Sequence, residues 1–460
     1  MASIIQRGSP AYEEARIGRV FNHRRPKRYP RAVVEAATLD DIMKTVQLAK
    51  IEGCSISIRS GGHSWAAWSV RDDAILLDLG KYQFMELNES KTIAKVSPSI
   101  TGNMLNGFLV TKGKMFAGGH CPDVAVGGFL LQGGMGWNCA HWGWACEKVK
   151  AIDVVTSEGN ILHCDENENQ ELLWAARGAG PGFPAIVTAF YLELRDSFKA
   201  VKSSTFVWPI SEYAKVMDWT IKVSQESDDS IEGVAVAMFP PGSTEMAITS
   251  HFVTFQQTEE AAIASLSHID NSRPPGAIKP IIEVPCVPTS LRKEYEDQAA
   301  ANPHKHRYRC DNAYIENNAN VTEVLREAFT TLPHGTKAFT LWFSMAPASR
   351  REMPDMALSM QSDHYFAIYC VWEDEKDDER CNAWVSTVMA KVERHSVGAY
   401  LGDSDFQVRR TRFWGEKQGK RLMELRRKWD PEGRICGYLD EGDRSGTAGL
   451  ENIHEWQRKL

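Results

Sequence analysis

Hydrophobic and polar positions in the first 200 residues repeat with two different periods. The stretch Thr38 to Asp41 has the pattern of a capping box, and apolar residues follow it at helical spacing until Gly53. Residues 100–112 show a second helical pattern. Short runs rich in β-branched residues predict strands at 55–59, 75–79, 93–96, 151–156 and 186–194. The pattern therefore predicts mixed helix and sheet in this part of the chain.

Between residues 200 and 395 helix-like and strand-like segments alternate. Helical spacing occurs at 211–225, 258–267 and 321–331, and strand-like runs occur at 231–239, 247–255, 338–345 and 365–372. Long strands separated by helices predict an antiparallel sheet covered by helices on one face. The charged run 373–380 is expected to be a solvated loop or helix end.

The last 60 residues contain one amphipathic helix. Leu422, Leu425 and Trp429 share a face of it, and the sequence 430–433, Asp-Pro-Glu-Gly, ends it. The glycine-rich texture of the first part stops near 195–199. We therefore expect an α+β fold with an N-terminal domain at 1–199, a second domain at 200–395 and a C-terminal segment, 396–460, that returns to the first domain.

Composition limits the partners and the compartment. The chain has 53 Lys and Arg against 60 Asp and Glu, a formal charge of −7, so nucleic acid and anionic membranes are not expected partners. No apolar run approaches the ~20 residues of a spanning helix, and the N-terminus lacks the apolar core of a signal peptide. The last three residues, 458–460, share only two with a peroxisomal address. We expect a cytoplasmic protein whose ten cysteines are mostly reduced thiols.

Three glycine-rich clusters are the main chemical signal. They lie at 59–63, 118–136 and 178–182. Backbone without side chains lets successive amides point at an anion such as a pyrophosphate. A nicotinamide Rossmann site does not fit, because no cluster follows a strand and opens a helix in the G-x-G-x-x-G arrangement. Ordinary turns explain any one cluster, but they explain three less well.

The clusters also carry a family resemblance. RSGGHSW at 59–65, GGHCPDVAVGGFLLQGGMGW at 118–137 and ELLWAARGAGPGFPAIVT at 171–188 resemble the berberine bridge enzyme-like branch of the vanillyl-alcohol oxidase superfamily. RRKWDPEGRI at 426–435 resembles the closing element of that family. The resemblance implies that residues 1–199 and 396–460 bind FAD and that 200–395 bind the substrate.

The resemblance also implies roles for particular residues. His63 matches the histidine that bonds to the flavin 8α-methyl group, and Cys121 matches the cysteine that bonds to flavin C6. An imidazole and a thiolate are suitable nucleophiles for these positions; a turn histidine and an inert buried cysteine are the alternatives. Val187 would meet the far end of FAD. The remaining residues implied to cradle FAD are Arg59, Ser60, Gly61, Gly62, Ser64, Gly127, Gly128, Gly134 and Gly136.

Val124 bears on the electron acceptor. The family uses the size of this side chain to control the access of oxygen to the reduced flavin, and valine goes with oxidases. The resemblance therefore implies O2 as the acceptor, with a core valine as the alternative reading.

The sequence departs from the family in its catalytic residues. Trp65 stands where many members have a tyrosine, and Gly402-Asp403-Ser404-Asp405 replaces an Asn-Tyr-x-Asp motif. Asp403 could take the proton of a substrate hydroxyl while hydride moves to flavin N5; loop capping by Asp403 and Asp405 is the alternative. Tyr369, on a predicted strand over the flavin, is the second candidate.

No metal site is expected. His304, His306 and Cys310 could imitate one, but no fourth ligand stands at zinc spacing, so structural or surface roles are expected. The sequence thus predicts an FAD-dependent oxidase of a small alcohol, phenol-derived or amine-like metabolite that forms hydrogen peroxide. A redox-neutral cyclase or isomerase, a dehydrogenase that does not use O2, and a non-catalytic flavin protein remain open.

Overall fold

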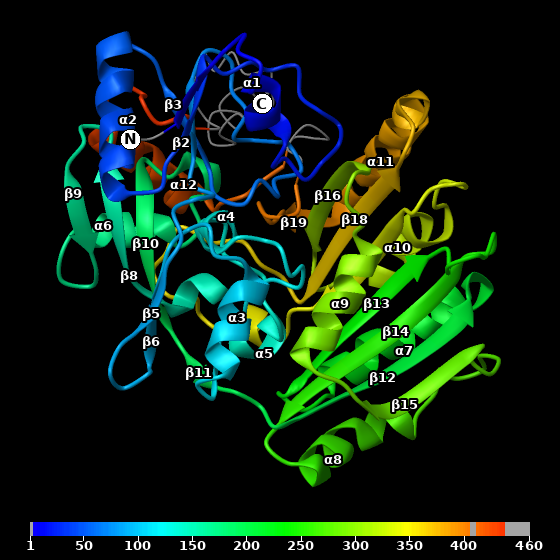
Figure 1. Cartoon of the computed structure of the whole chain (residues 1–460). Helices are drawn as coiled ribbons and strands as arrows, with labels where there is room; N and C mark the ends of the chain where they lie inside the picture. The colour runs from blue at the N-terminus through cyan, green and yellow to red at the C-terminus, as the bar shows by residue number, and fades with distance from the viewer. Residues whose placement is uncertain (1–2, 405–410, 438–460) are drawn as a thin grey trace.

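Two sheets form the part of the molecule before residue 195, at the left of Figure 1. The computed structural model describes residues 3–404 and 411–437. The first sheet has the order β1-β2-β4-β3, with β1 antiparallel to β2 and the other pairs parallel. Its strands are β1 (Ser3–Gln6), β2 (Ala32–Glu35), β3 (Ile56–Arg59) and β4 (Ile75–Asp78).

The second sheet is antiparallel, with the order β5-β6-β10-β8-β9. Its strands are β5 (Met85–Leu87), β6 (Ile93–Val96), β8 (Val149–Thr156), β9 (Ile161–Cys164) and β10 (Ala185–Glu193). A two-stranded ladder joins β7 (Lys114–Met115) to β11 (Arg195–Asp196). The helices here are α1 (Tyr12–Ile17), α2 (Leu39–Glu52), α3 (Gly102–Val110), α4 (Val126–Leu131), α5 (Cys139–Trp142) and α6 (Gln170–Ala176).

Helix α2 shows why the sequence pattern was informative. The Thr38 hydroxyl accepts a hydrogen bond from the Asp41 amide, and the Asp41 carboxylate accepts one from the Thr38 amide. The helix ends at Gly53, whose φ of +61° is a conformation that favours glycine. Ile42, Val46 and Ala49 are buried between the helix and both sheets. The predicted capping box, stripe and stop signal are confirmed.

The second half of the chain builds one eight-stranded antiparallel sheet, at the right of Figure 1. Its order is β15-β12-β14-β13-β17-β18-β16-β19. The strands are β12 (Ala200–Pro209), β13 (Ile231–Met238), β14 (Ala247–Gln256), β15 (Ile282–Pro288), β16 (Arg307–Ile315), β17 (Phe339–Ser344), β18 (His364–Trp372) and β19 (Ser396–Gly398). The helices are α7 (Tyr213–Gln225), α8 (Glu259–Asp270), α9 (Leu291–Ala301), α10 (Val321–Thr330) and α11 (Asp378–Val392).

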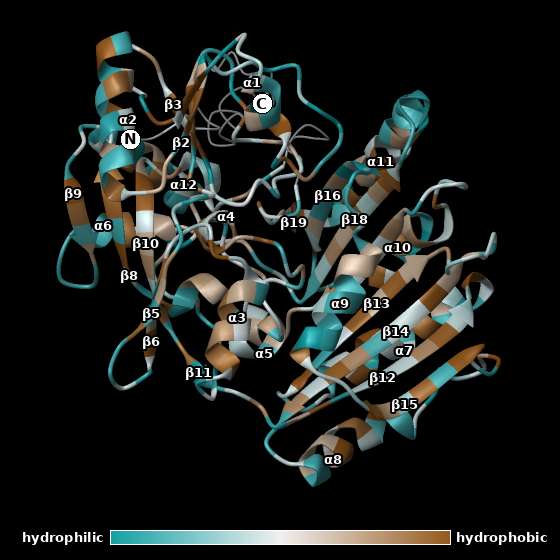
Figure 2. Cartoon of the chain, in the orientation of Figure 1, coloured by the Kyte–Doolittle hydropathy of each residue, from teal (hydrophilic) through white to brown (hydrophobic). Residues whose placement is uncertain are grey.

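The two faces of this sheet have different neighbours. Ile368 and Cys370 point to the face that packs against α7, α10 and α11, whereas Tyr369 points to the first half of the chain, where Trp65 lies. The prediction of an antiparallel sheet covered by helices on one face is confirmed. Figure 2 shows the corresponding banding of hydrophobic and hydrophilic residues along strands β12 to β14.

The chain then returns to its first half. Helix α12 (Glu416–Trp429) buries Leu422 and Leu425 in the core that holds the five-stranded sheet. Ile435 forms a parallel bridge with Ile56 of β3. Asp405 and residues 458–460, which the sequence analysis named, lie outside the described residues.

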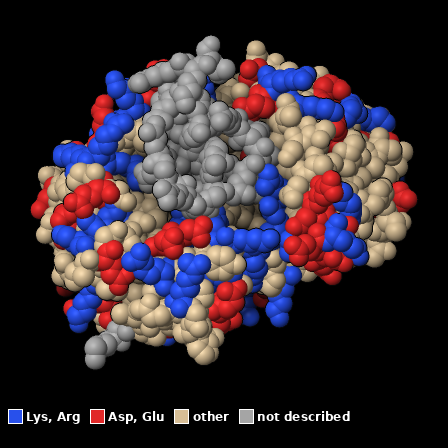
Figure 3. Space-filling view, turned by 90° about the horizontal axis from the view of Figure 1, so that it is seen from above, with Lys and Arg blue, Asp and Glu red and all other residues tan. Residues whose placement is uncertain are grey.

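Surface charge is mixed. Basic and acidic side chains are interspersed over the face shown in Figure 3. Within the described residues no helix is long and apolar enough to cross a membrane. The ten cysteines all lie in the described ranges, and none forms a disulfide.

Candidate active site

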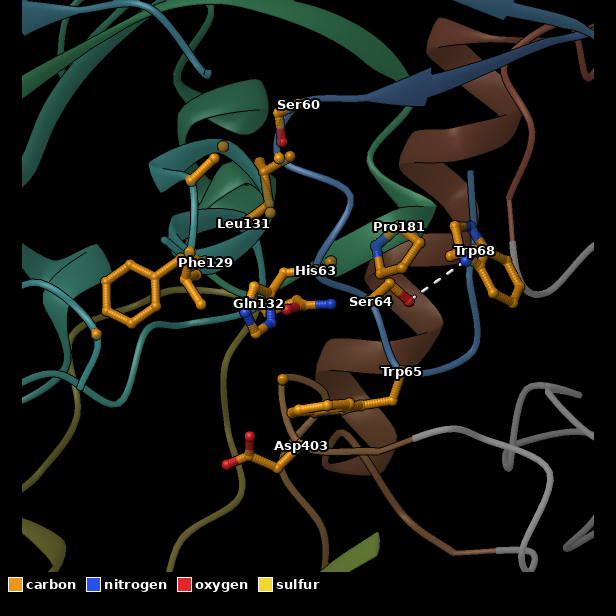
Figure 4. A pocket seen from close by; sticks show the side chains of 18 of the residues that line it. Ser60, His63, Ser64, Trp65, Trp68, Phe129, Leu131, Gln132, Pro181 and Asp403 are labelled. Carbon is orange, nitrogen blue, oxygen red and sulfur yellow. Dashed lines mark hydrogen bonds between the residues drawn. The ribbon is translucent and has the colours of Figure 1, made fainter. Parts of the chain in front are cut away.

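A deep cavity lies between the two halves of the molecule (Figure 4). One wall comes from the loop after β3, from the segment that leads into α4, and from the segment that leads into β10. The opposite side comes from β17, β18 and the loop at residues 402–403. Eleven of the thirteen predicted cofactor residues, and all three predicted catalytic residues, line this one cavity.

The loop after β3 presents its backbone to the cavity. In the described part of the chain, the amides of residues 60–65 donate to no protein acceptor. Gly62 has a φ of +86°, and a Cβ built there would lie 1.9 Å from the Arg19 carbonyl oxygen. At Gly61 a Cβ would lie 2.7 Å from that of Ala125. Glycine is therefore required at both positions for the close packing of this loop, which lines the cavity.

The side chain of Arg59 holds the fold together, whereas its backbone was expected to contact the cofactor. Its guanidinium is buried, donates to Asp78 through Nε at 3.0 Å and Nη2 at 2.7 Å, and also donates to the Arg16 carbonyl. The resemblance implied backbone contact with FAD for Arg59 to Ser64, and the guanidinium itself ties β3 to β4 and to the N-terminal segment. The Ser64 hydroxyl accepts a hydrogen bond from the Trp68 amide at 3.3 Å (Figure 4).

The glycines of the second cluster divide into two groups. Gly127 and Gly128 line the cavity, and a Cβ at Gly128 would enter open space. Gly134 and Gly136 do not line it. A Cβ at Gly134 would meet Ala145 and Phe129, and one at Gly136 would meet the Ala117 carbonyl, so close packing accounts for both glycines.

His63 extends from the glycine loop into the cavity (Figure 4). Its Nε2 lies 3.2 Å from an oxygen of Asp123, and its ring stacks on Phe21 with 4.0 Å between centroids. Asp123 follows Cys121 by two residues in the motif, but the sequence analysis assigned it no role. Packing and a carboxylate thus fix the His63 ring in one orientation.

Cys121, Val124 and Val187 also border the cavity. Burial and the nearby carboxylates of Asp123 and Asp403 raise the pKa of the Cys121 thiol. The thiol therefore keeps its proton here, whereas the sequence argument assumed a thiolate; a general base has to remove the proton before it can react. Val124 both lines the cavity and packs on the core of the first half, so the structure is compatible with both readings of this residue.

Asp403 is the centre of a polar cluster under the large sheet. The Tyr365 hydroxyl donates a 2.6 Å hydrogen bond to its Oδ2, and Tyr369 and Trp65 also direct donors at the carboxyl group. Burial raises the pKa of Asp403 above its usual range, although the hydrogen bonds from Tyr365 and Tyr369 and the charge of His120 oppose this. A carboxylate with a raised pKa is suited to general base chemistry.

Trp65 and Tyr369 frame this cluster. The Trp65 ring lies edge-on to Tyr369 at 5.7 Å and to His63 at 5.5 Å. Tyr369 stacks on Phe339 at 4.6 Å, and burial raises the pKa of its hydroxyl well above the usual range, so it stays protonated. Tyr369 is therefore a hydrogen-bond donor here rather than a base.

Sequence reasoning missed three residues of this region. Tyr365 is four positions from Tyr369 on the same face of β18, a spacing that would have identified it. The Tyr400 hydroxyl accepts hydrogen bonds from the amides of Gly134 and Met135, both at 3.2 Å. Glu232 pairs with His120 at 2.8 Å across the two halves of the chain. No short-range sequence pattern would have predicted the contacts of Tyr400 and Glu232.

No metal centre is present among the described residues, where no three His, Cys, Asp or Glu side chains are grouped as ligands. His306 pairs with Glu373 at 3.0 Å, whereas His304 lies 3.3 Å from Asp123. The two histidines thus point to different partners.

Comparisons with known proteins agree with this architecture. A family model described as an FAD binding domain matches residues 30–165. The FAD-linked oxidoreductase ptmO of Penicillium ochrochloron is 39% identical over 437 residues, which cover 95% of this chain and 96% of the relative. The (R)-6-hydroxynicotine oxidase of Paenarthrobacter nicotinovorans is 28% identical over 208 residues, 44% of each chain. The solved structure of BBE-like 1 from Physcomitrella patens has a TM-score of 0.81 at 18% identity and covers 95% of this chain and 96% of its own.

The fold and the glycine-lined cavity define a two-domain FAD-binding oxidoreductase. The chain belongs to the FAD-linked oxidoreductases, and it shares its fold with BBE-like 1 of Physcomitrella patens. The resemblance inferred from the three glycine clusters is confirmed.

Proposed function

We propose that the protein is an oxidase that takes a hydride from a small alcohol or related metabolite and reduces O2 to hydrogen peroxide. The observation that carries the proposal is that His63, Cys121 and Val124 share a single cavity with Asp403 and its tyrosines. The name of the nicotine-derivative oxidase, one of its relatives, is in line with this reaction class. In this proposal residues 1–199 and 396–460 bind FAD, and residues 200–395 cover the substrate.

The cavity wall fits FAD. The amides of residues 60–65, which have no acceptor among the described residues, can donate to the pyrophosphate oxygens, and the space beside Gly128, which a Cβ would fill, admits a cofactor against the backbone. When bound, FAD supplies a two-electron acceptor whose reduced form reacts with O2. We propose that His63 and Cys121 hold it covalently and that Val187 meets its far end.

The residues of this chain would handle the substrate proton. The ionised Asp403 accepts the proton of the substrate hydroxyl, and Tyr365 and Tyr369 orient the carboxylate by hydrogen bonds. Trp65, Phe339, Leu341 and Phe343 give the cavity an apolar lining that excludes water. The lining favours a substrate with an apolar body and one hydroxyl or amine group near Asp403.

A substrate screen tests the reaction class. Small alcohols, phenol-derived compounds and amines are offered to the purified protein while hydrogen peroxide release and flavin absorbance are followed. An oxidase substrate bleaches the flavin without air, and air restores its colour with the formation of peroxide. Bleaching that air does not reverse would identify a dehydrogenase. Conversion to an isomer without oxygen uptake would identify a redox-neutral enzyme.

Denaturation tests the two tethers. We expect the flavin to stay with the denatured protein and to link the peptides that carry His63 and Cys121. The variant Cys121→Ala should keep flavin on His63 alone, while Cys286→Ala, in the edge strand β15, should retain both links. Release of all flavin from the denatured wild-type protein would rule out both bonds.

A further inference from the structure

Two histidines from different halves of the molecule share one carboxylate. His63 Nε2 lies 3.2 Å from Asp123 Oδ1, and His304 Nε2 lies 3.3 Å from Asp123 Oδ2. Exposure increases along the chain of three side chains, from 13% for His63 to 38% for Asp123 and 67% for His304. The three groups therefore connect the cavity to solvent.

Each member comes from a different element, and packing holds them together. His63 follows β3, Asp123 precedes α4, and His304 lies between α9 and β16. Phe21 stacks on the His63 ring at 4.0 Å and meets the His304 ring edge-on at 5.0 Å. The contact with Phe21 restricts rotation of the His63 ring, so the same nitrogen stays on Asp123.

The carboxylate decides which nitrogen of His63 carries the proton. A neutral imidazole has one N–H group and one lone pair, and a carboxylate can only accept a hydrogen bond. The contact with Asp123 therefore places the proton on Nε2 and leaves the lone pair on Nδ1. Although burial opposes ionisation, the hydrogen bond from His63 lowers the pKa of Asp123. Asp123 is therefore an ionised acceptor.

We propose that Asp123 is a positioning residue that prepares His63 for covalent attachment to FAD, with His304 as the proton exit. The inference rests on the tether in the proposed function. Attachment breaks one C–H bond of the flavin 8α-methyl group and the N–H bond of His63, and it forms one C–N bond. The two electrons and two protons so released reduce O2, the electron acceptor of the proposed function, to hydrogen peroxide.

Asp123 acts on the proton of this step. As Nδ1 forms the new bond, the imidazole ring becomes positively charged, and the Nε2 proton is then lost. Asp123 receives it at 3.2 Å, and its other oxygen is already in contact with the solvent-exposed His304. A carboxylate partner thus orients the ring before the reaction and removes the proton afterwards, in the same way as carboxylates behind metal-binding histidines.

The test measures attachment in a background with a single tether. Protein carrying Cys121→Ala is purified from riboflavin-limited cells and incubated with FAD in air. Flavin bound to the native protein and flavin retained after denaturation are followed in time, with the mass of the peptide that contains His63. Asp123→Asn and Asp123→Glu are compared in this background. His304→Gln is compared with His306→Gln, a matched control on the same loop whose partner is Glu373.

We expect Asp123→Asn to bind FAD but to attach it at least about tenfold more slowly, the scale found for lost carboxylate partners of histidine ligands. Asp123→Glu should restore most of the rate, which a purely structural role would not require. His304→Gln should be slower than His306→Gln.

Two results would overturn the inference. The first is that Asp123→Asn attaches FAD at the same rate as its parent. The second applies if Asp123→Asn does not bind FAD, and it is that His304→Gln and His306→Gln attach FAD at the same rate. If the Cys121→Ala parent itself releases all flavin on denaturation, the His63 tether is absent, and the proposed function fails at that step instead.

Discussion

At the scale of single residues, the motifs located the glycine-rich wall of the cavity better than the wall under the large sheet. His63 and Cys121 lie within short glycine motifs, so local sequence carries their position. Asp403 was found only by its place relative to a family motif, and its partners Tyr365 and Tyr369 come from a strand about 35 residues away. The assumed thiolate of Cys121 was not supported, because burial and neighbouring carboxylates favour the thiol, and no sequence pattern shows burial.

Asp403→Asn tests the base. If Asp403 accepts the substrate proton, the rate of anaerobic flavin reduction should fall by roughly 10²–10⁴-fold, while the amount of bound flavin stays the same. Burial raises the pKa of Asp403, so the wild-type rate should fall as pH decreases through that raised value, where the carboxylate becomes protonated. The variant should lack this acid limb. Stopped-flow reduction across pH measures both effects, and Asp165→Asn, at a partly exposed aspartate of a surface turn, serves as control. An unchanged rate would assign Asp403 to loop capping.

Val124→Ile tests the access of oxygen. The larger side chain should extend into the cavity beside the cofactor cradle, because Val124 lines it. We expect reoxidation of the reduced flavin by O2 to slow by about tenfold or more, while anaerobic reduction by substrate changes little. Rapid mixing of reduced protein with oxygenated buffer measures the first rate, and an artificial electron acceptor should restore turnover. If both half-reactions keep their rates, Val124 is only a core residue.

At the scale of elements, helices and strands with strong periodicity could be predicted from the sequence, and those with weak periodicity could not. Helix α2, helix α12 and strands β13, β14, β17 and β18 occur where the pattern predicted them. Strand β15 contains Pro285 and Pro288 and is largely exposed, so it has neither the composition nor the alternation of a buried strand. Strand β16 carries Arg307, Arg309 and Asp311, and Arg307 is paired with Asp378, which is distant in sequence. The charged run at 373–380 starts as loop, forms one 3-10 turn at Glu375–Asp377 and then opens α11.

Gly127→Ala tests the contact between α4 and the cofactor loop. A Cβ at Gly127 would lie 2.8 Å from Pro98 Cβ, 2.9 Å from the Pro98 carbonyl oxygen and 2.9 Å from Ser60 Oγ. Neither the proline ring nor its carbonyl can move away, so the helix and the loop should separate. We expect a loss of about 1–3 kcal/mol in the free energy of unfolding and weaker retention of FAD.

Gly107→Ala is the matched control for this change. Gly107 is an exposed glycine in helix α3, and a Cβ there would meet nothing within 4 Å. The same substitution should stabilise the protein by about 0.5–1 kcal/mol, since alanine is the better helix former. Chemical unfolding and flavin absorbance compare the two variants. Equal flavin content and stability in both would mean that the Gly127 contact does not hold the loop.

At the scale of the whole molecule, the two halves are joined by contacts that no local sequence pattern predicts. Glu232 on β13 accepts from His120 and from the Asn138 amide, and the Asn138 side chain donates to the Asp229 carbonyl at 2.9 Å. The His120 ring also contacts the rings of Trp137 and Phe343 in tilted arrangements, one from each half. The antiparallel sheet and its covering helices could be predicted from periodicity, but their docking onto the cofactor half depends on pairs more than 90 residues apart.

Glu232→Gln tests this junction, and its effect should depend on pH. Burial alone would lower the pKa of His120, but the charge and hydrogen bond of Glu232, with the charge of Asp403, raise it above the unfolded value of about 6.5. The His120 contribution to stability is therefore complete below that unfolded value and is lost as pH rises through the raised folded value. Near pH 6 the variant should lose about 1.5–3 kcal/mol, the scale of a hydrogen bond to a charged group.

The difference between wild type and Glu232→Gln should then narrow as pH rises, because the wild-type His120 becomes neutral while the variant has already lost the ion pair. Thermal unfolding from about pH 6 to about pH 9 would show converging midpoints. Glu226→Gln is the matched control, since Glu226 pairs with His268 at 3.3 Å on the surface, where such pairs contribute little. A Glu232→Gln midpoint that runs parallel to wild type at all pH values would contradict a charged pair at the junction. In that case the hydrogen bonds that Asn138 donates to Glu232 and to the Asp229 carbonyl, rather than a charged pair, would join the halves there.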